Sequence, residues 1–582
     1  MRLLNNKTLR AISVLCSLTF VPCAIAEVAL LWLQFEAAKA NGDEPTLPDF
    51  SYAGYDYSES ELPDISNWAV FNVADYGAIA NDDNYDDLAI QLAIDAAQNA
   101  GGGVVMFPAG RFLVSPNETV GENIFIRASN IVLKGAGAGD NGTEIFKVNK
   151  KVNNGEFIFE VSPASTGESV ITTVVENAQR ESFEIVVADA SQLSVGQRIL
   201  LRADSVELAQ SYYSPLTIRS EWTRLLNDGF NLREIHSIAA INGNTVRLRE
   251  PLHISLTIGS TPIQVRSYNM INNVGIEDIR FKGNWDSYPE DFDHHKDDIH
   301  DYAWNALRLD NVENGWIQNV EFKDWNQGIY IDGSAALTLR NITFTGKKGH
   351  MSIHTRRSYG VLIKDSADHA GHHHGPGVGY WGCGTVYLRY QMLAGQNIDS
   401  HSGSPYATLF DNVTNGHLSN NGGPHESYPH HGKHLVAWNM TLEGGPDSYN
   451  FWSASRNGHT FAMPYFIGLQ GKSVSLTEGT YSANELLGQM AEPASLFEAQ
   501  LALRLGSATP EQPEETEEPE QEPEGETGGE QQPTEETPTA QPNPPNASNT
   551  SGGGAIGGLL LTLLMVLAAA TKINYTTRRT GN

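Results

Sequence analysis

The residues with the clearest chemical potential are histidines, which crowd into one stretch of the chain. Twelve of the eighteen histidines in the 582 residues lie between His350 and His434. An imidazole titrates near neutral pH and can act as a general acid, a general base or a metal ligand. The stretch is therefore the first candidate for an active site, against the simpler alternative that single histidines in it are solvated loop residues. The twelve are His350, His354, His369, His372, His373, His374, His401, His417, His425, His430, His431 and His434.

The same stretch holds a local basic patch made of Lys347, Lys348, Arg356 and Arg357, in a chain whose net charge is -31. A guanidinium group pairs bidentately with a carboxylate or sulfate. The patch predicts an anionic polymer as ligand, and we expect Lys348, Arg356 and Arg357 to bind it. The negative charge of the whole chain argues against a nucleic-acid partner.

Metal binding is left open by the sequence. Three adjacent histidines stand in the GHHHG run at 371–375, and His350 and His354 form a second group. Zinc needs ligands that converge at about 2.0 Å, whereas adjacent residues of an extended chain point to opposite sides. Neither group by itself therefore predicts a transition-metal site, and no cofactor is assigned.

Carboxylates gather in an expected loop at 284–301. Two of them at a separation of about 5–10 Å would suit a glycoside hydrolase. Their oxygens would equally suit calcium, and a solvated acidic loop explains them without any function. These carboxylates are Asp286, Glu290, Asp291, Asp293, Asp297, Asp298 and Asp301, and a hydrolase could instead use Asp310, Asp324 or Asp332.

A repeated six-residue pattern indicates how distant residues come together. Segments 276–281, 317–322 and 339–344 each place apolar residues first, fourth and sixth. The spacings of 41 and 22 residues fit two turns and then one turn of a solenoid with about twenty residues per turn. Because stacked strands lie about 4.8 Å apart, histidines one turn apart would share a face.

The stretch FNVADYGAIANDDNYDDLAIQLAIDAAQNAGGGVVMFPAGRFLV, residues 71–114, predicts a strand, a helix and a second strand. It resembles the N-terminal signature of the pectate-lyase-like superfamily, which implies an all-β fold, a right-handed parallel β-helix closed by capping helices. That superfamily contains polysaccharide lyases, glycoside hydrolases and phage tailspikes. We place the body at 68–507 with a small β insertion at 182–256, where hairpins interrupt the repeat. A capping box at Ser495 opens a last helix that runs to Leu505.

Segments 400–416 and 429–439 also resemble recurring turns of uncharacterised bacterial members of that superfamily. The resemblance singles out His401, Tyr406, His431 and Trp438. Together with His350, the first three are our predicted proton-transfer residues, and Trp438 is a predicted substrate-binding residue.

The two ends of the chain have the features of targeting segments. Residues 1–26 have the charge, apolar run and small residues of a secretory signal peptide. Residues 508–551 are acidic and rich in proline, and they predict a disordered stalk. Residues 552–582 resemble the GlyGly-type sorting signals of Gram-negative bacteria, with a membrane anchor as the alternative. We therefore expect a protein that is secreted to the Gram-negative cell surface or released, with the tail contacting the envelope.

These observations predict a secreted enzyme that degrades an acidic, uronate-containing polysaccharide by β-elimination. Two alternatives remain: a glycoside hydrolase of the same fold and a noncatalytic surface adhesin that holds a glycan.

Overall fold

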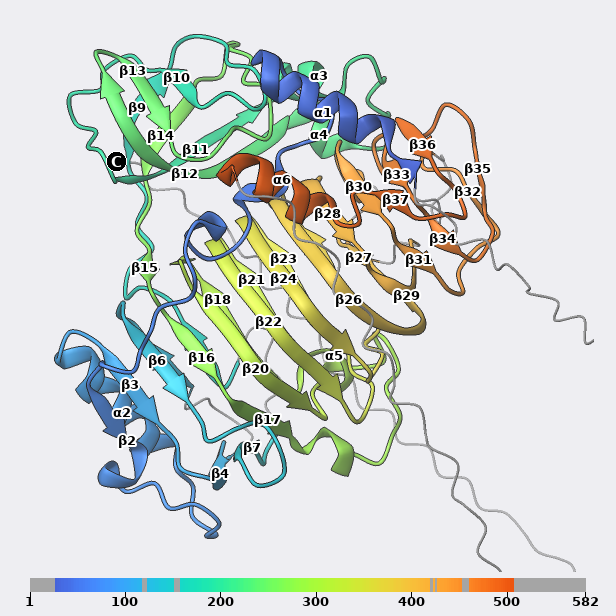
Figure 1. The fold of residues 1–582 in the computed structure, drawn as a ribbon. Coiled ribbons are helices and arrows are strands. Elements are labelled where there is room, and N and C mark those ends of the chain that lie inside the picture. The colour runs from blue at the N-terminus through green and yellow to red at the C-terminus, as the bar shows by residue number, and fades with distance from the viewer. Residues whose placement is uncertain are drawn as a thin grey trace, which may run out of the picture. The chain divides into compact units, whose positions relative to one another are not determined.

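The computed structural model describes residues 27–117, 123–150, 157–418, 422–423, 427–452 and 460–506. The predicted signal peptide 1–26, stalk 508–551 and terminal sorting signal or anchor 552–582 lie outside these residues. Within the described ranges no helix is both long and apolar enough to cross a membrane. The described chain winds into a right-handed parallel β-helix, which confirms the predicted fold (Figure 1).

One large sheet runs along the body and is built from short strands that pair in parallel register. It comprises β2 (Val70–Asn72), β3 (Gly103–Met106), β4 (Gly110–Val114), β6 (Ile131–Lys134), β7 (Thr143–Lys147), β15 (Ile271–Asn272), β16 (Gly275–Glu277), β17 (Ile279–Gly283), β19 (Val312–Glu313), β20 (Trp316–Lys323), β22 (Ala335–Thr345), β24 (Tyr359–Asp368), β26 (Cys383–Asn397), β28 (Tyr406–Asp411), β29 (Thr414–His417), β30 (Leu435–Trp438), β31 (Thr441–Leu442), β33 (Tyr465–Ile467), β34 (Gln470–Gly471) and β36 (Ala483–Glu485).

A second parallel sheet carries most of the candidate site. Its members, in spatial order, are β27 (Asp399–Ser400), β25 (Gly377–Gly379), β23 (Met351–Arg356), β21 (Gln327–Asp332), β18 (Asn305–Asp310), β8 (Phe159–Val161) and β5 (Ile124–Ile126). Side chains alternate between its two faces. Ile329, Ile331 and Ile353 belong to the buried core, while Tyr330 and His354 lie on the outer face.

The predicted repeat is confirmed, but its spacing was wrongly interpreted. Ile276 pairs directly with Ile317, and Ile317 pairs with Leu339, so all three lie on consecutive turns. Their phenylalanines stack as well, with ring centroids of Phe281 and Phe322 5.3 Å apart. The 41-residue spacing is therefore one turn and not two, because the chain leaves the β-helix between β17 and β18 and forms a long loop that contains α5 (Asp298–Tyr302).

The β insertion forms an antiparallel sheet of its own, seen at the top of Figure 1. It extends from residue 170 to residue 267 and is thus wider than the 182–256 expected from the hairpins, because β14 pairs with β11 and β9 pairs with β14. Its strands are β9 (Val170–Val174), β10 (Glu184–Val186), β11 (Arg198–Ser205), β12 (Phe230–Asn242), β13 (Thr245–Leu248) and β14 (Ile263–Ser267), and its helices are α3 (Val206–Tyr213) and α4 (Thr223–Asn227).

The N-terminal segment before residue 68 belongs to the same folded unit as the body. In that segment β1 (Glu27–Val28) pairs in parallel with β37 (Ala491–Glu492), and α1 (Leu30–Asn41) follows. The remaining elements are α2 (Asp87–Asn99), α6 (Leu496–Leu505), the β32 (Ser448–Tyr449) and β35 (Ser475–Leu476) pair, and the 3-10 helices η1 (Phe50–Tyr52), η2 (Tyr55–Ser58), η3 (Val73–Tyr76) and η4 (Asn284–Ser287).

The starts of α6 and α2 are held in different ways. Ser495 Oγ accepts a hydrogen bond from the Glu498 N–H at 3.2 Å, as the capping box predicts. Asp86 precedes α2 but makes no cap bond. Its carboxylate instead accepts bonds from the backbone N–H groups of Ile79 and Leu113, and so ties the helix start to the first strands.

Candidate active site

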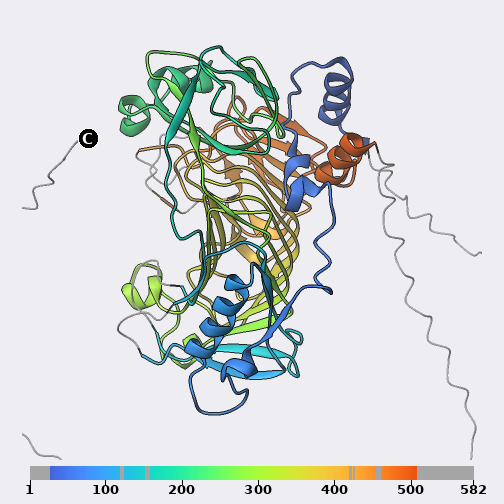
Figure 2. The same cartoon turned by 90° about the vertical axis from the view of Figure 1, so that its left-hand side faces the viewer.

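A pocket of about 400 Å³ lies on the outer face of the second sheet, over β21, β23, β25 and β27. The loop that contains α5 closes one side of it. Figure 2 shows α5, in yellow-green, on the opposite side of the body from α1 and α6. The lining residues are His294, His295, Tyr302, Gln327, Tyr330, His350, Met351, His354, Arg356, His374, Tyr380, Asp399, His401, Gly422 and Gly423.

Strand register explains why these side chains meet. Tyr330, His354, Gly377 and Asp399 are successive partners in one row across the sheet. Gly377 lacks a side chain, and a Cβ there would lie 2.8 Å from His354 Nδ1. The missing side chain leaves the space in which His354 Nδ1 and Asp399 Oδ2 approach to 3.6 Å.

Asp399 is the electrostatic centre of the pocket. Its Oδ2 lies 3.0 Å from His401 Nδ1 and 3.3 Å from His374 Nδ1, and the side chain is 1% exposed. Burial by itself raises the pKa of this carboxyl, but His374 and His401 outweigh burial and hold the pKa well below its usual range. Burial lowers the pKa of His401, and the Asp399 carboxylate more than reverses that effect, so the pKa of His401 is raised. Asp399 thus fixes the His401 ring with Nδ1–H toward the carboxylate and leaves Nε2 free.

The loop after β17 brings further histidines over the sheet. Its base is anchored by Trp285, which stacks on Tyr288 and lies under Lys347 Nζ at 4.1 Å from the ring centroid. Asp297 caps α5 by accepting bonds from the N–H groups of Ile299 and His300. These contacts hold the base of the loop and the start of α5.

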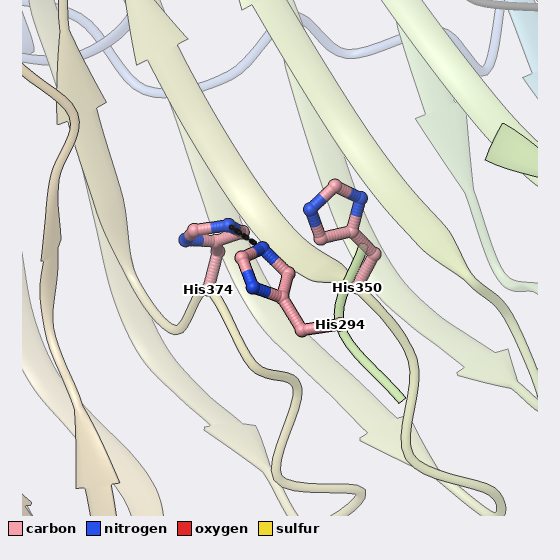
Figure 3. Close-up of side chains that lie close together, drawn as sticks. All are labelled: His294, His350 and His374. Carbon is pink, nitrogen blue, oxygen red and sulfur yellow. Dashed lines mark hydrogen bonds between the residues drawn. The ribbon is translucent and has the colours of Figure 1, made fainter. Parts of the chain in front are cut away.

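Histidines from the loop and from the sheet face one another in the pocket. His294 Nε2 lies 3.2 Å from His374 Nε2, with His350 beside them (Figure 3). His350 Nδ1 donates to the carbonyl oxygen of Asp301 at 2.8 Å. Burial, reinforced by His374, lowers the pKa of His350 to about 3 and that of His294 to about 4, so both rings are neutral at physiological pH.

Arg356 is the cation of the pocket wall. It donates to the Tyr330 hydroxyl, and its guanidinium lies 4.3 Å from the Tyr380 ring centroid. Asp332 Oδ2 lies 3.4 Å from its Nε. The other two predicted cations do not line the pocket. Arg357 is paired with Asp332 and Lys348 is exposed.

Three residues predicted from resemblance alone lie elsewhere, and their side chains are completely buried. The Tyr406 hydroxyl donates to Glu234 Oε1 in the insertion at 2.8 Å, and Trp438 Nε1 donates to the carbonyl of Pro493. His431 donates from Nδ1 to the Gly432 carbonyl and accepts at Nε2 from Thr408. Tyr406 and Trp438 belong to the large sheet and point into packing contacts, which residue type alone does not reveal. Of the predicted proton-transfer residues, the structure brings together His350 and His401.

Several carboxylates of the acidic loop form ion pairs or hydrogen bonds within the loop or with the strand before it. Asp286 pairs with Lys282 at 3.0 Å, Glu290 faces His300 at 3.3 Å, and Asp301 accepts from His295 Nδ1 at 2.8 Å. None of the loop carboxylates is among the described residues that line the pocket. The loop supplies histidines to the pocket instead of a pair of acids.

Sequence reasoning missed His294, His295, Tyr302, Tyr330, Tyr380 and Asp399. Two signals were present. The adjacent His294 and His295 interrupt the acidic loop, and Asp399 stands two residues before His401, the spacing that puts both side chains on one face of a strand.

Comparison with known proteins assigns two segments. Residues 70–207 match the family described as "Rhamnogalacturonase A/epimerase, pectate lyase-like", and residues 371–512 match "Domain of unknown function (DUF4955)". The second segment contains Asp399 and His401.

The curated relatives match over a short stretch only. Mannuronan C5-epimerase AlgE3 of Azotobacter vinelandii is 46% identical over 70 residues, which is 12% of this chain and 4% of that protein. Alginate lyase 7 of the same organism is 43% identical over 70 residues, 12% of this chain and 8% of that protein.

Comparison with solved structures gave matches of low identity and low TM-score. The tailspike protein gp49 from Pseudomonas phage LKA1 has a TM-score of 0.42 at 13% identity, covering 72% of this chain and 77% of the other. The exopolygalacturonase from Thermotoga maritima has a TM-score of 0.32 at 12% identity, covering 78% and 96%. Residues 70–207 match the pectate-lyase-like family, and the residues that line the pocket all lie outside this matched segment.

Proposed function

We propose that the pocket is the active site of an enzyme that cleaves an acidic, uronate-containing polysaccharide by β-elimination. One observation carries the proposal. An oriented imidazole, His401, a phenol, Tyr380, and a guanidinium, Arg356, lie side by side, whereas Asp399 is the one carboxylate among the described lining residues.

Each of these groups has a defined part in the elimination. Arg356 pairs with the uronate carboxylate and stabilises the negative charge that develops when C5 loses its proton. Nε2 of His401 accepts that proton, since Asp399 holds the other ring nitrogen. The electron pair of the C5–H bond forms the C4–C5 double bond, the bond from C4 to the glycosidic oxygen breaks, and the Tyr380 hydroxyl gives its proton to the departing oxygen.

The composition of the pocket disfavours the hydrolase alternative. Hydrolysis by the usual route needs an acid and a second carboxylate about 5–10 Å apart on the two sides of the scissile bond. Asp399 is 1% exposed and its oxygens face His354, His374 and His401. It is therefore placed to orient imidazoles and not to attack a sugar.

The names of the curated relatives support an acidic polysaccharide as substrate. They are called mannuronan C5-epimerases and an alginate lyase. Epimerisation and elimination both begin with removal of the C5 proton of a uronate, the step assigned here to His401. We further propose that the protein works outside the cell, which rests on the signal-like and sorting-like ends of the sequence.

The test is to incubate the purified protein with mannuronan, polygalacturonate and a neutral glucan as control. Ultraviolet absorbance of an unsaturated uronate, formed with either acidic polymer and not with the glucan, is the expected result. New reducing ends without that chromophore would support the hydrolase. Exchange of C5 hydrogen with deuterated water without chain cleavage would support an epimerase. Glycan binding with none of these products would support the adhesin.

A further inference from the structure

The loop after β17 and the outer face of the second sheet bring three histidines from distant parts of the chain to one point. His294 comes from the loop, His350 from the position just before β23 and His374 from the segment before β25. One ring nitrogen of each lies within 4.8 Å of those of the other two. Figure 3 shows the His294 ring directed between the other two rings.

Neighbouring oxygen atoms select which nitrogen is free. His350 Nδ1 donates to the Asp301 carbonyl, so Nε2 of the neutral ring carries its lone pair. His374 Nδ1 lies 3.3 Å from Asp399 Oδ2, which favours Nδ1–H and leaves Nε2 to face His294. A second nitrogen held by a carbonyl or a carboxylate is the usual environment of a histidine that binds a metal.

The distance between two of these nitrogens fits a shared ion. His294 Nε2 and His374 Nε2 are 3.2 Å apart. Two nitrogens at about 2.0–2.1 Å from one tetrahedral zinc ion are separated by roughly 3.3 Å. The protein therefore already holds this pair at the spacing of two ligands, and a ring nitrogen of His350 lies within 4.8 Å of both.

We propose that His294, His350 and His374 bind one divalent transition-metal ion of the zinc class, with Asp399 orienting His374 from behind. Three imidazole ligands favour such an ion over calcium or magnesium, which prefer oxygen. The ligands face an open pocket, so the fourth position is left to water or to a substrate oxygen. The proposal of a metal site is based on ligand geometry and does not depend on the proposed elimination.

Zinc binding to the untagged full-length protein after chelator treatment tests the site. Calorimetric titration with zinc alone should give one tight equivalent. His294→Ala and His374→Ala should each weaken zinc binding by at least about 100-fold, and Asp399→Asn by about 10–100-fold, the range found for groups that support metal ligands. His294 lies on a surface loop, so its replacement should leave thermal unfolding unchanged.

Two controls keep the assignment specific. His369 is exposed and outside the pocket, so His369→Ala should bind zinc like the wild type. His401→Ala should also retain tight binding. Absence of a tight equivalent in the wild type, or equal binding by the wild type and His294→Ala, would overturn the proposal. Loss of binding in His401→Ala with retention in His294→Ala would assign the ion to His374, Asp399 and His401 and would likewise overturn it.

Discussion

Two buried histidine clusters of this protein differ in the balance between imidazoles and carboxylates. In the pocket, one carboxylate, Asp399, is shared by three imidazoles. In the insertion, His236 lies between two carboxylates, with Nε2 3.0 Å from Glu234 and Nδ1 3.6 Å from Glu250, and all three side chains are fully buried. Burial outweighs the shared carboxylate at His354 and lowers its pKa to about 4, whereas two carboxylates overcome burial at His236 and raise its pKa to about 9.

This difference distinguishes the pocket, where we place the chemistry, from the insertion cluster, whose role is structural. In the insertion cluster, Glu250 also accepts bonds from Arg198 and from the Ser237 N–H, and Glu234 accepts from the Tyr406 hydroxyl. The pocket instead leaves imidazole lone pairs facing open space. A histidine-rich stretch is therefore informative only when the partners of each ring are known.

Breaking the insertion cluster should give the largest effect. Glu250→Ala removes one of the two carboxylates that pair with the buried Arg198 and one of the two beside His236. Loss of one member of a buried ion pair costs about 3–5 kcal/mol of unfolding free energy. Chemical denaturation measures it. The matched control is Glu184→Ala, whose pair with Arg247 is exposed at 3.4 Å, so about 0–1 kcal/mol is expected. Equal losses in both variants would contradict the structural role of the cluster.

Removing the pocket cation should affect catalysis and not folding. Arg356→Ala deletes a charged hydrogen-bond donor worth about 1.5–3 kcal/mol, so kcat/KM on a polyuronate should fall roughly 10–100-fold. Lys348→Ala, an exposed lysine outside the pocket, is the control and should change kcat/KM little. A larger loss from Lys348→Ala than from Arg356→Ala would move the binding site away from the pocket.

Stability should depend on pH through His236. Its pKa is about 6.5 in the unfolded chain and about 9 in the fold, so its contribution is complete below pH 6.5 and is lost as pH rises through 9. Glu234, Glu250, Arg198 through Glu250, and the ring of Tyr359 surround it. Unfolding free energies measured from pH 6 to 9.5 should fall by on the order of 2 kcal/mol in the wild type. His236→Gln should flatten that slope, and an unchanged slope would refute the assignment.

The pocket loop should respond most weakly to loss of its helix cap. Asp297→Ala removes two backbone hydrogen bonds at the start of α5, and loss of such a cap costs about 1 kcal/mol. Hydrogen exchange should quicken in residues 284–302 and remain unchanged in the insertion. Faster exchange throughout the body would show that the loop is not a separate local unit.

The sequence predicted the fold better than the site. Apolar residues at fixed places identified the stacked turns at Ile276, Ile317 and Leu339, because inward positions of a β-helix must be apolar. It predicted a loop at 284–301 but not that this loop lies within a single turn, since a 41-residue spacing fits two turns equally well. The contribution of His294 was hidden for that reason.

Within the histidine-rich stretch, residue type could not separate facing side chains from packed ones. His350, His401 and Arg356 were identified, and all three line the pocket. Tyr406, His431 and Trp438 are equally polar or aromatic but are buried in other contacts. The direction of each side chain depends on strand register, which only the three-dimensional structure supplies.

The most direct test of the central claim compares two histidines that the sequence treats alike. Initial rates of unsaturated-uronate formation are measured for His401→Gln and His431→Gln, with thermal unfolding followed in parallel. If the pocket is the active site, His401→Gln loses roughly 100-fold or more in turnover and stays folded, since a general acid or base contributes about that much. The His431 ring bonds to Thr408 and to the Gly432 carbonyl and does not line the pocket. His431→Gln should therefore keep its turnover as long as it folds. A folded His431→Gln without activity, beside an active His401→Gln, would contradict the account.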